Sequence, residues 1–153
     1  MLRIGLIADT HNLLRPEAEA FLQGCDRIIH AGDICDAKIL DKLNLIAPVT
    51  AVRGNNDKGA WAEQLAETER MQLDERCIYI IHDVAQLELD TLTTDVKVVI
   101  FGHSHKPSIE NRNGVLFVNP GSAGPRRFSL PVSVGELIVE NGLISARTVQ
   151  LKI

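Results

Sequence analysis

The first two-thirds of the chain contains five apolar runs, and each one is followed directly by polar residues. The first run, residues 2–8, is almost wholly apolar, which predicts a strand buried on both faces. Similar runs cover residues 27–31, 49–52, 77–81 and 98–101. The stretches between the first three runs have helical spacing, and this β-α-β-α-β order predicts parallel strands joined by right-handed crossovers.

The residues that follow these strands are of types that bind metal ions. They are Asp9, His11, Asp33, Asn55, His82, His103 and His105. The carboxyl ends of parallel strands are where open α/β sheets place their sites, so these side chains are expected to converge. A turn hydrogen bond explains any single one of them equally well, but not the whole set. Mixed carboxylate, imidazole and amide ligands suit Mn, Fe, Co, Ni or Zn, whereas a structural zinc would favour cysteine.

The remaining segments predict helices early and hairpins late. Helices are expected over residues 16–23 and 36–47, with Asp36 as the cap of the second, and over about ten residues from Val84. Residues 60–76 are polar and irregular, with a short strand expected at 71–73. Beyond residue 105, β-like runs at 109–112, 114–118, 131–139 and 143–151 surround two Asn-Gly turn signals, which predicts antiparallel β-structure.

Length and composition predict one globular domain over residues 1–153. The chain is 45% hydrophobic and 24% charged, which is ordinary for a soluble protein. No apolar run approaches the ~20 residues of a membrane span, and Asp9 interrupts what would be the core of a signal peptide. Cys25, Cys35 and Cys77 lack C-x-x-C spacing, so reduced thiols in a cytoplasmic protein are expected.

The net charge and a glycine-rich loop limit the classes of ligand that the protein can bind. The formal net charge is −4 and there is no basic run, which argues against a non-specific nucleic-acid surface. A protein of this charge that acts on phosphate compounds needs positive charge from another source, such as divalent ions. Gly54 and Gly59 have the spacing of a phosphate-binding loop, but Ala60 and Trp61 follow where such a loop needs Lys and Ser or Thr. A nucleotide-binding P-loop is therefore excluded.

The order D-x-H, G-D, G-N-x-[DE], a lone His and G-H-x-H resembles that of the calcineurin-like metallophosphoesterases. The resemblance covers residues 2–125 and, because no cap is added, is greatest to the compact bacterial and archaeal phosphodiesterases. It implies an α/β fold in which two mixed β-sheets pack as a sandwich flanked by helices. The stretch 119–122, with Pro125 and Arg126, is similar to a further motif of these small members and implies Ser122 and Arg126 as substrate contacts.

Carried over by position, the resemblance implies two divalent metal ions, with manganese as the first expectation. One ion would lie on Asp9, His11, Asp33 and His105; the other would lie on Asp33, Asn55, His82 and His103. A hydroxide held between the ions would attack the phosphorus of a small phosphodiester. Asp33, Asn55, Asn56 and His82 form the expected catalytic set. The alternatives are a phosphomonoesterase or nuclease of the same superfamily, or a non-catalytic scaffold like the retromer subunit of this fold.

Two positions depart from the superfamily pattern. Asn56 stands where many members have a histidine that can protonate the leaving group, and an amide cannot act as a general acid. Asp83 stands where glycine commonly follows His82, and we interpret it as orienting that histidine or narrowing the site. His30 is interpreted as structural. Neither a membrane nor a nucleic-acid partner is expected, and a homo-oligomer remains compatible with the sequence.

Overall fold

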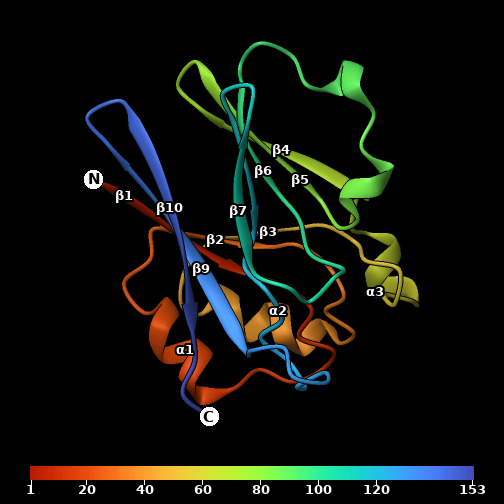
Figure 1. Ribbon diagram of the computed structural model, residues 1–153. Helices are drawn as coiled ribbons and strands as arrows, with labels where there is room; N and C mark the ends of the chain where they lie inside the picture. The colour runs from red at the N-terminus through yellow and green to blue at the C-terminus, as the bar shows by residue number, and fades with distance from the viewer.

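The computed structural model describes all residues from 1 to 153 and contains two five-stranded mixed sheets that face each other (Figure 1). The first sheet has the spatial order β10 (Leu143–Gln150), β9 (Ser133–Glu140), β1 (Leu2–Ile7), β2 (Arg27–His30), β3 (Val49–Ala51). The second has the order β4 (Thr68–Leu73), β5 (Arg76–Ile81), β6 (Val96–Ile100), β8 (Val115–Asn119), β7 (Ser108–Arg112). The expected α/β fold with two mixed sheets is confirmed.

The strand pairing confirms the parallel beginning of the chain and the antiparallel hairpins at its end. Strands β1, β2 and β3 are parallel, as are β5, β6 and β8. The two Asn-Gly turns do close hairpins, with Asn113 and Asn141 at φ 52° and 54°. These hairpins do not form one antiparallel unit, however, because β7–β8 completes the second sheet and β9–β10 the first. Sequence periodicity shows a hairpin but not the sheet that it joins.

Two short helices cover the outer face of the first sheet. They are α1 (Pro16–Leu22) and α2 (Ala37–Asn44), and the Asp36 side chain caps α2 by accepting a hydrogen bond from the Lys38 amide at 2.9 Å. Leu22 and Leu43 are fully buried against this sheet. A third helix, α3 (Ala60–Glu63), lies in the segment that the sequence predicted to be irregular, and β4 extends the short strand expected there.

The helix expected from Val84 is wrong. Two 3₁₀ turns, Val84–Gln86 and Leu89–Thr91, occupy this segment, and the chain is extended between them at Leu87 and Glu88. The break lets Val84, Leu87 and Leu92 pack on the outer face of the second sheet, whereas Leu89 is 84% exposed. Burial against the sheet therefore outweighs the helical spacing of the apolar residues. None of the helices in the fold is long and apolar enough to span a membrane.

The two sheets enclose an aliphatic core that holds the strand ends in place. Ile4, Leu6 and Ile29 face it from the first sheet, and Ile80 and Ile100 from the second, all fully buried. Burial of each such side chain contributes ~1.5–3 kcal/mol. The loops that leave the carboxyl ends of β1, β2, β3, β5 and β6 thus start from a rigid base.

Glu136 on β9 links three strands of the first sheet and provides a test of the fold. Its carboxylate accepts hydrogen bonds from the Arg3 and Arg147 guanidiniums at 2.9 and 3.0 Å. Burial would raise the pKa of Glu136, but the two arginine bonds outweigh it and lower that pKa below its usual value. Its contribution to stability is therefore present at neutral pH and is lost as pH falls through the lowered pKa.

We expect Glu136→Gln to lower the free energy of unfolding by ~1–2 kcal/mol at pH 7, since Arg147 is largely exposed and its pairing is screened. The difference from the wild type should shrink at an acidic pH below the lowered pKa, where the wild-type carboxylate is also protonated. Urea unfolding at both pH values measures it, with Glu140→Gln as the exposed control. An equal difference at both pH values would contradict the assignment.

Candidate metal centre

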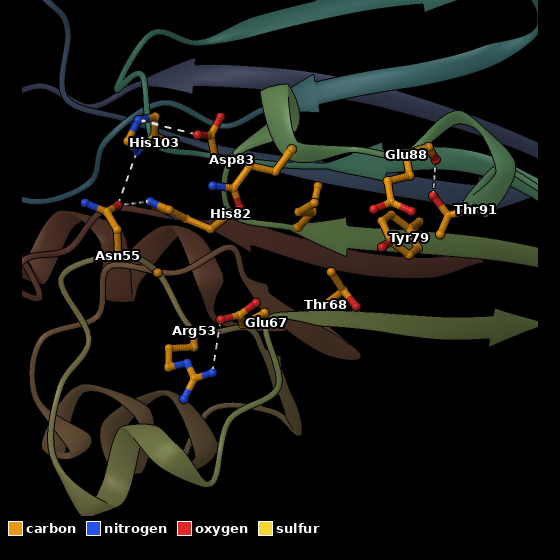
Figure 2. Close-up of a pocket in the computed structure, with 13 residues that line it drawn as sticks. Arg53, Asn55, Glu67, Thr68, Tyr79, His82, Asp83, Glu88, Thr91 and His103 are labelled. Atoms are coloured by element: carbon orange, nitrogen blue, oxygen red, sulfur yellow. Dashed lines mark hydrogen bonds and ion pairs between the residues drawn. The ribbon is translucent and has the colours of Figure 1, made fainter.

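All seven residues predicted as metal ligands meet at the edge where the carboxyl ends of the two sheets approach each other. Asp9 and His11 follow β1, Asp33 follows β2 and Asn55 follows β3. From the second sheet, His82 follows β5, and His103 and His105 follow β6. Figure 2 shows Asn55, His82 and His103 pointing toward one another from three of these loops. The convergence predicted from the strand ends is therefore present in the structure.

Asp9 lies at the centre of the cluster. Its Oδ1 atom is 3.7 Å from His105 Nε2, 3.9 Å from His82 Nε2 and 4.0 Å from His11 Nε2. Asp9 is fully buried, and Oδ1 has no hydrogen-bond partner. Burial raises the pKa of Asp9 to about 7. A buried carboxylate oxygen that faces three imidazoles without a bond to any of them is suited to bind a cation.

Asp33 joins the His11 and His82 sides of the cluster. Its Oδ2 atom lies 3.6 Å from His11 Nε2 and 3.3 Å from His82 Nε2. Asn56 holds the carboxylate by donating from its backbone N–H at 2.8 Å and from its side-chain Nδ2 at 2.9 Å. Burial alone would raise the pKa of Asp33, but the bond that His82 donates when its ring is protonated, together with the bonds from Asn56, outweighs burial and lowers that pKa. Asp33 is thus held as an ionised carboxylate.

His82 is oriented by the main chain. Its Nδ1 lies 2.8 Å from the Ala31 carbonyl, which can only accept, so Nδ1 carries a proton. In the neutral ring, Nε2 then directs a lone pair at Asn55 Oδ1, 3.0 Å away, and at Asp33 Oδ2. An arrangement of acceptors that face one another requires a proton or a cation between them. Burial lowers the pKa of His82, but the bond to Asp33 and the two carboxylate charges raise it overall.

Asn55 and His103 form the exposed side of the cluster. Asn55 Oδ1 is 3.2 Å from His103 Nδ1 as well as close to His82. The expectation that Asp83 orients His82 is wrong, because the Ala31 carbonyl fills that position. Asp83 instead accepts from the Ala85 amide and lies 3.8 Å from His103 Nε2 (Figure 2). Its position in the sequence beside His82 does not reveal this orientation.

The backbone at the site is strained in a way that brings the side chains together. Five of the seven candidate ligands have left-handed φ angles, which are uncommon for residues other than glycine: Asp9 (53°), His11 (42°), Asp33 (58°), His103 (72°) and His105 (64°). Gly54 has no such angle but lies so close to the Asp33 carboxylate that a Cβ there would collide with it. This clustering of strain is typical of functional sites.

Asp57 supports the centre and was not identified as a site residue from the sequence. It is 5% exposed and accepts four backbone hydrogen bonds. Oδ2 accepts from the amides of Asp33 and Gly54 at 3.0 and 2.8 Å, and Oδ1 accepts from Ile34 and Cys35 at 2.8 and 2.7 Å. One carboxylate therefore ties the β2 loop to the β3 loop. The acidic position of the G-N-x-[DE] pattern was the available signal.

Two further residues near the centre have structural surroundings. His30 is fully buried, accepts from the Gly32 amide and lies 3.1 Å from the Thr10 hydroxyl, and burial lowers its pKa to about 3. This agrees with its structural interpretation as a neutral core histidine. Cys35 Sγ lies 3.7 Å from His11 Nδ1, and burial raises the pKa of this thiol to about 11. A thiol of this kind is a poor nucleophile.

The loop after β8 approaches the centre from the His105 side. Ser122, predicted to contact substrate, is buried and donates to the Asp9 carbonyl at 3.0 Å, so it holds the Asp9 loop in place. Its contact with substrate stays a prediction. Burial lowers the pKa of His105 to about 4, and the positive charge of Arg127 adds to that effect. The substrate contact expected of Arg126 also stays a prediction.

The donor set fits divalent metal ions. Ligand atoms of Asp9, His11 and His105 lie within 4.8 Å of one another, as do those of Asp9, Asp33 and His82. Two buried atoms, Asp9 Oδ1 and His105 Nδ1, have no hydrogen-bond partner. Carboxylate and imidazole donors with no cysteine suit a first-row divalent ion. The side chains can therefore hold cations between them without rearrangement of the strands.

Comparison with known proteins agrees with this centre. The family model of the calcineurin-like phosphoesterase superfamily domain matches residues 2–142. The chain belongs to the calcineurin-like phosphoesterase superfamily. It is 36% identical to a probable metallophosphoesterase of Methanocaldococcus jannaschii, over 92% of this chain and 77% of that protein. It is 26% identical to the phosphodiesterase YfcE of Escherichia coli K12, over 95% of this chain and 91% of that enzyme.

Solved structures share the fold. An archaeal phosphodiesterase superimposes with a TM-score of 0.78 at 24% identity, over 97% of this chain and all of that one. Vps29 of Chaetomium thermophilum also superimposes with a TM-score of 0.78, at 21% identity over 99% of this chain and 98% of that one. At these identities the likeness concerns the fold alone, and it does not favour the non-catalytic alternative.

Proposed function

We propose that the protein is a two-metal phosphodiesterase that acts on small phosphodiesters. The observation that carries the proposal is the position of Asp33, whose Oδ2 atom lies within 3.6 Å of His11 and within 3.3 Å of His82. A carboxylate between two imidazole-bearing halves of one cluster is suited to be shared by two ions. Membership in the phosphoesterase superfamily supports the phosphate chemistry.

The division of ligands follows the two halves of the cluster. Asp9, His11, Asp33 and His105 would hold one ion, and Asp33, Asn55, His82 and His103 the other. Asp9 Oδ1 faces imidazoles of both halves, so it lies near the boundary between them. When bound, two divalent ions supply a water of lowered pKa and positive charge for the phosphoryl oxygens. The Ala31 carbonyl keeps the Nε2 lone pair of His82 directed into the centre.

The surroundings favour a small diester over a nucleic acid. The formal net charge of −4 offers no extended positive surface for a polyanion. The amide of Asn56 cannot act as a general acid. Asn56 instead donates hydrogen bonds to both carboxylate oxygens of Asp33, so it acts first by positioning that carboxylate. A cytoplasmic location remains a prediction, and so does the organisation of the chain as a single domain without an added cap segment.

The test is a substrate panel on protein stripped of metal and refilled in parallel with Mn, Ni, Co, Zn or Mg. We expect hydrolysis of aryl phosphodiesters in the refilled protein, most with manganese, and slower hydrolysis of monoesters. No hydrolysis of diesters with any metal would overturn the proposal. A clear preference for monoesters would favour the phosphomonoesterase alternative.

The presence of Asn56 in place of a general acid leads us to expect a steep dependence of the hydrolysis rate on the acidity of the leaving group. Without a general acid, which is typically worth ~10²–10⁴-fold, the enzyme should cleave activated aryl diesters well and alkyl diesters poorly. Asn56→His should flatten the dependence of kcat/KM on leaving-group acidity and raise monoester turnover. Asn56→Ala, which removes only the side-chain bond to Asp33, should lower rates without changing the slope. Equal, shallow slopes for wild type and Asn56→His would contradict this role.

Arg127 is expected to assist substrate binding from the His105 side. Its positive charge contributes to the lowered pKa values of His11 and His105, which supports a role for Arg127 in attracting an anion to them. We expect Arg127→Ala to reduce kcat/KM on an aryl diester by about five- to tenfold, mainly through KM. Arg126→Ala is the matched comparison, and an effect confined to Arg126 would restore the prediction made from the sequence.

A further inference from the structure

A pocket of about 340 Å³ opens directly beside the candidate metal centre. Asn55, His82 and His103 form one end of it, and Tyr79, Glu88 and Thr91 lie at the other end (Figure 2). Its volume is at the lower end of the range for small-molecule sites, ~300–1,000 Å³. A group bonded to a phosphate at the metal centre can therefore extend into this pocket past His82 and His103.

The charged groups of the pocket are mostly acidic. Arg53 is neutralised by Glu67, whose carboxylate lies 3.2 Å from the guanidinium. Of the other two acidic residues, Asp83 lies 3.8 Å from His103 Nε2, and Glu88 has no ion-pair partner. The lining thus holds one guanidinium, Arg53, against the carboxylates of Glu67, Asp83 and Glu88, and this negative balance disfavours a second anionic group there.

The inner end of the pocket offers a free polar group. Tyr79 is 5% exposed, and its hydroxyl has no hydrogen-bond partner within the protein. Arg70 lies over the ring of Tyr79 at 5.1 Å, but it donates to the Thr91 carbonyl at 2.7 Å and is not part of the pocket lining. Unlike Asp9 Oδ1 and His105 Nδ1, this hydroxyl is not shut off from solvent, so it can form a hydrogen bond with a ligand in the pocket.

The His103 side of the centre thus carries acidic groups, Asp83 and Glu88. We propose that this pocket binds the larger alcohol group of the phosphodiester and selects a positively charged, amine-bearing alcohol over an anionic one. The inference rests on the proposed phosphodiesterase function and specifies its substrate class. Glu88 is the residue that determines this specificity.

Three alkyl methyl phosphodiesters of equal length test the proposal. The variable group is aminopropyl, butyl or carboxyethyl, so that only the terminal charge changes while the small methyl group leaves the pocket to the larger one. Titration calorimetry on the manganese-loaded full chain gives dissociation constants, and inhibition of bis(p-nitrophenyl) phosphate hydrolysis gives inhibition constants. Glu88→Gln is the variant, and Glu140→Gln, at the exposed end of β9, is the control.

We expect the aminopropyl diester to bind about three- to tenfold more tightly than the butyl diester, and the carboxyethyl diester most weakly. Glu88→Gln should bring the aminopropyl-to-butyl ratio to within about twofold of one, and Glu140→Gln should leave it unchanged. Binding of the carboxyethyl diester as tight as that of the aminopropyl diester, or a ratio unaffected by Glu88→Gln, overturns the proposal. If no diester is hydrolysed but the binding order holds, the proposed function fails and the pocket assignment stands.

Discussion

Asp33→Asn is expected to lower kcat/KM for an aryl phosphodiester by ~10³-fold or more. The substitution removes a negative charge from the position between the His11 and His82 halves of the centre, where Asp33 Oδ2 lies 3.6 and 3.3 Å from the two rings. Loss of one shared ligand weakens the binding of both metal ions. Stabilisation of the transition state by these ions is worth several kcal/mol. Steady-state assays with excess manganese measure the effect.

Asp41→Asn is the matched control, because Asp41 is an exposed carboxylate on α2 and lies outside the centre. It should retain wild-type kcat/KM. The Asp33→Asn protein should unfold at nearly the wild-type urea concentration, since Asn56 can still bond to the remaining side-chain oxygen. Wild-type kcat/KM in folded Asp33→Asn protein would show that Asp33 is not shared by two catalytic ions.

Asp57→Ala is expected to have the largest effect on stability. Truncation leaves the buried amides of Asp33, Ile34, Cys35 and Gly54 without acceptors. Each unsatisfied buried group costs ~1–3 kcal/mol, so with partial relaxation the total loss should reach ~3–6 kcal/mol. Urea unfolding measures this loss, and a manganese titration should show weaker binding because the Asp33 loop is no longer tied to the β3 loop.

Asp36→Ala provides the comparison, since Asp36 caps α2 by accepting a single amide hydrogen bond. Its loss should cost ~1 kcal/mol and leave manganese affinity unchanged. If Asp57→Ala does not fold, Asp57→Asn, which keeps one acceptor oxygen, should give an intermediate loss. Equal costs for the Asp57 and Asp36 substitutions would contradict the role given to Asp57.

The strand ends could be predicted because burial and chemistry leave local signals in the sequence. The run before Asp9 is apolar except for Arg3, and the structure places it at the centre of a sheet with neighbours on both sides. An abrupt change from such a run to Asp or His has few structural explanations. The shared edge of the sheets then brings residues 9 and 105 together although they are far apart in the chain.

Contacts that run through the backbone could not be predicted. The four amides bound by Asp57 and the Ala31 carbonyl that orients His82 depend on loop conformations, several of which are left-handed at residues other than glycine. Side-chain direction was also hidden: Asp83 is adjacent to His82 in the chain, yet it faces His103. The 3₁₀ turns after Val84 were mistaken for a helix because helical spacing was present, while burial on the second sheet required another path.

The most direct test of the two-metal centre is elemental analysis of the folded wild-type chain after refilling with manganese and removal of unbound ions. We predict two manganese ions per chain in a protein that hydrolyses an aryl phosphodiester. A folded and active chain that retains less than one ion would contradict the account.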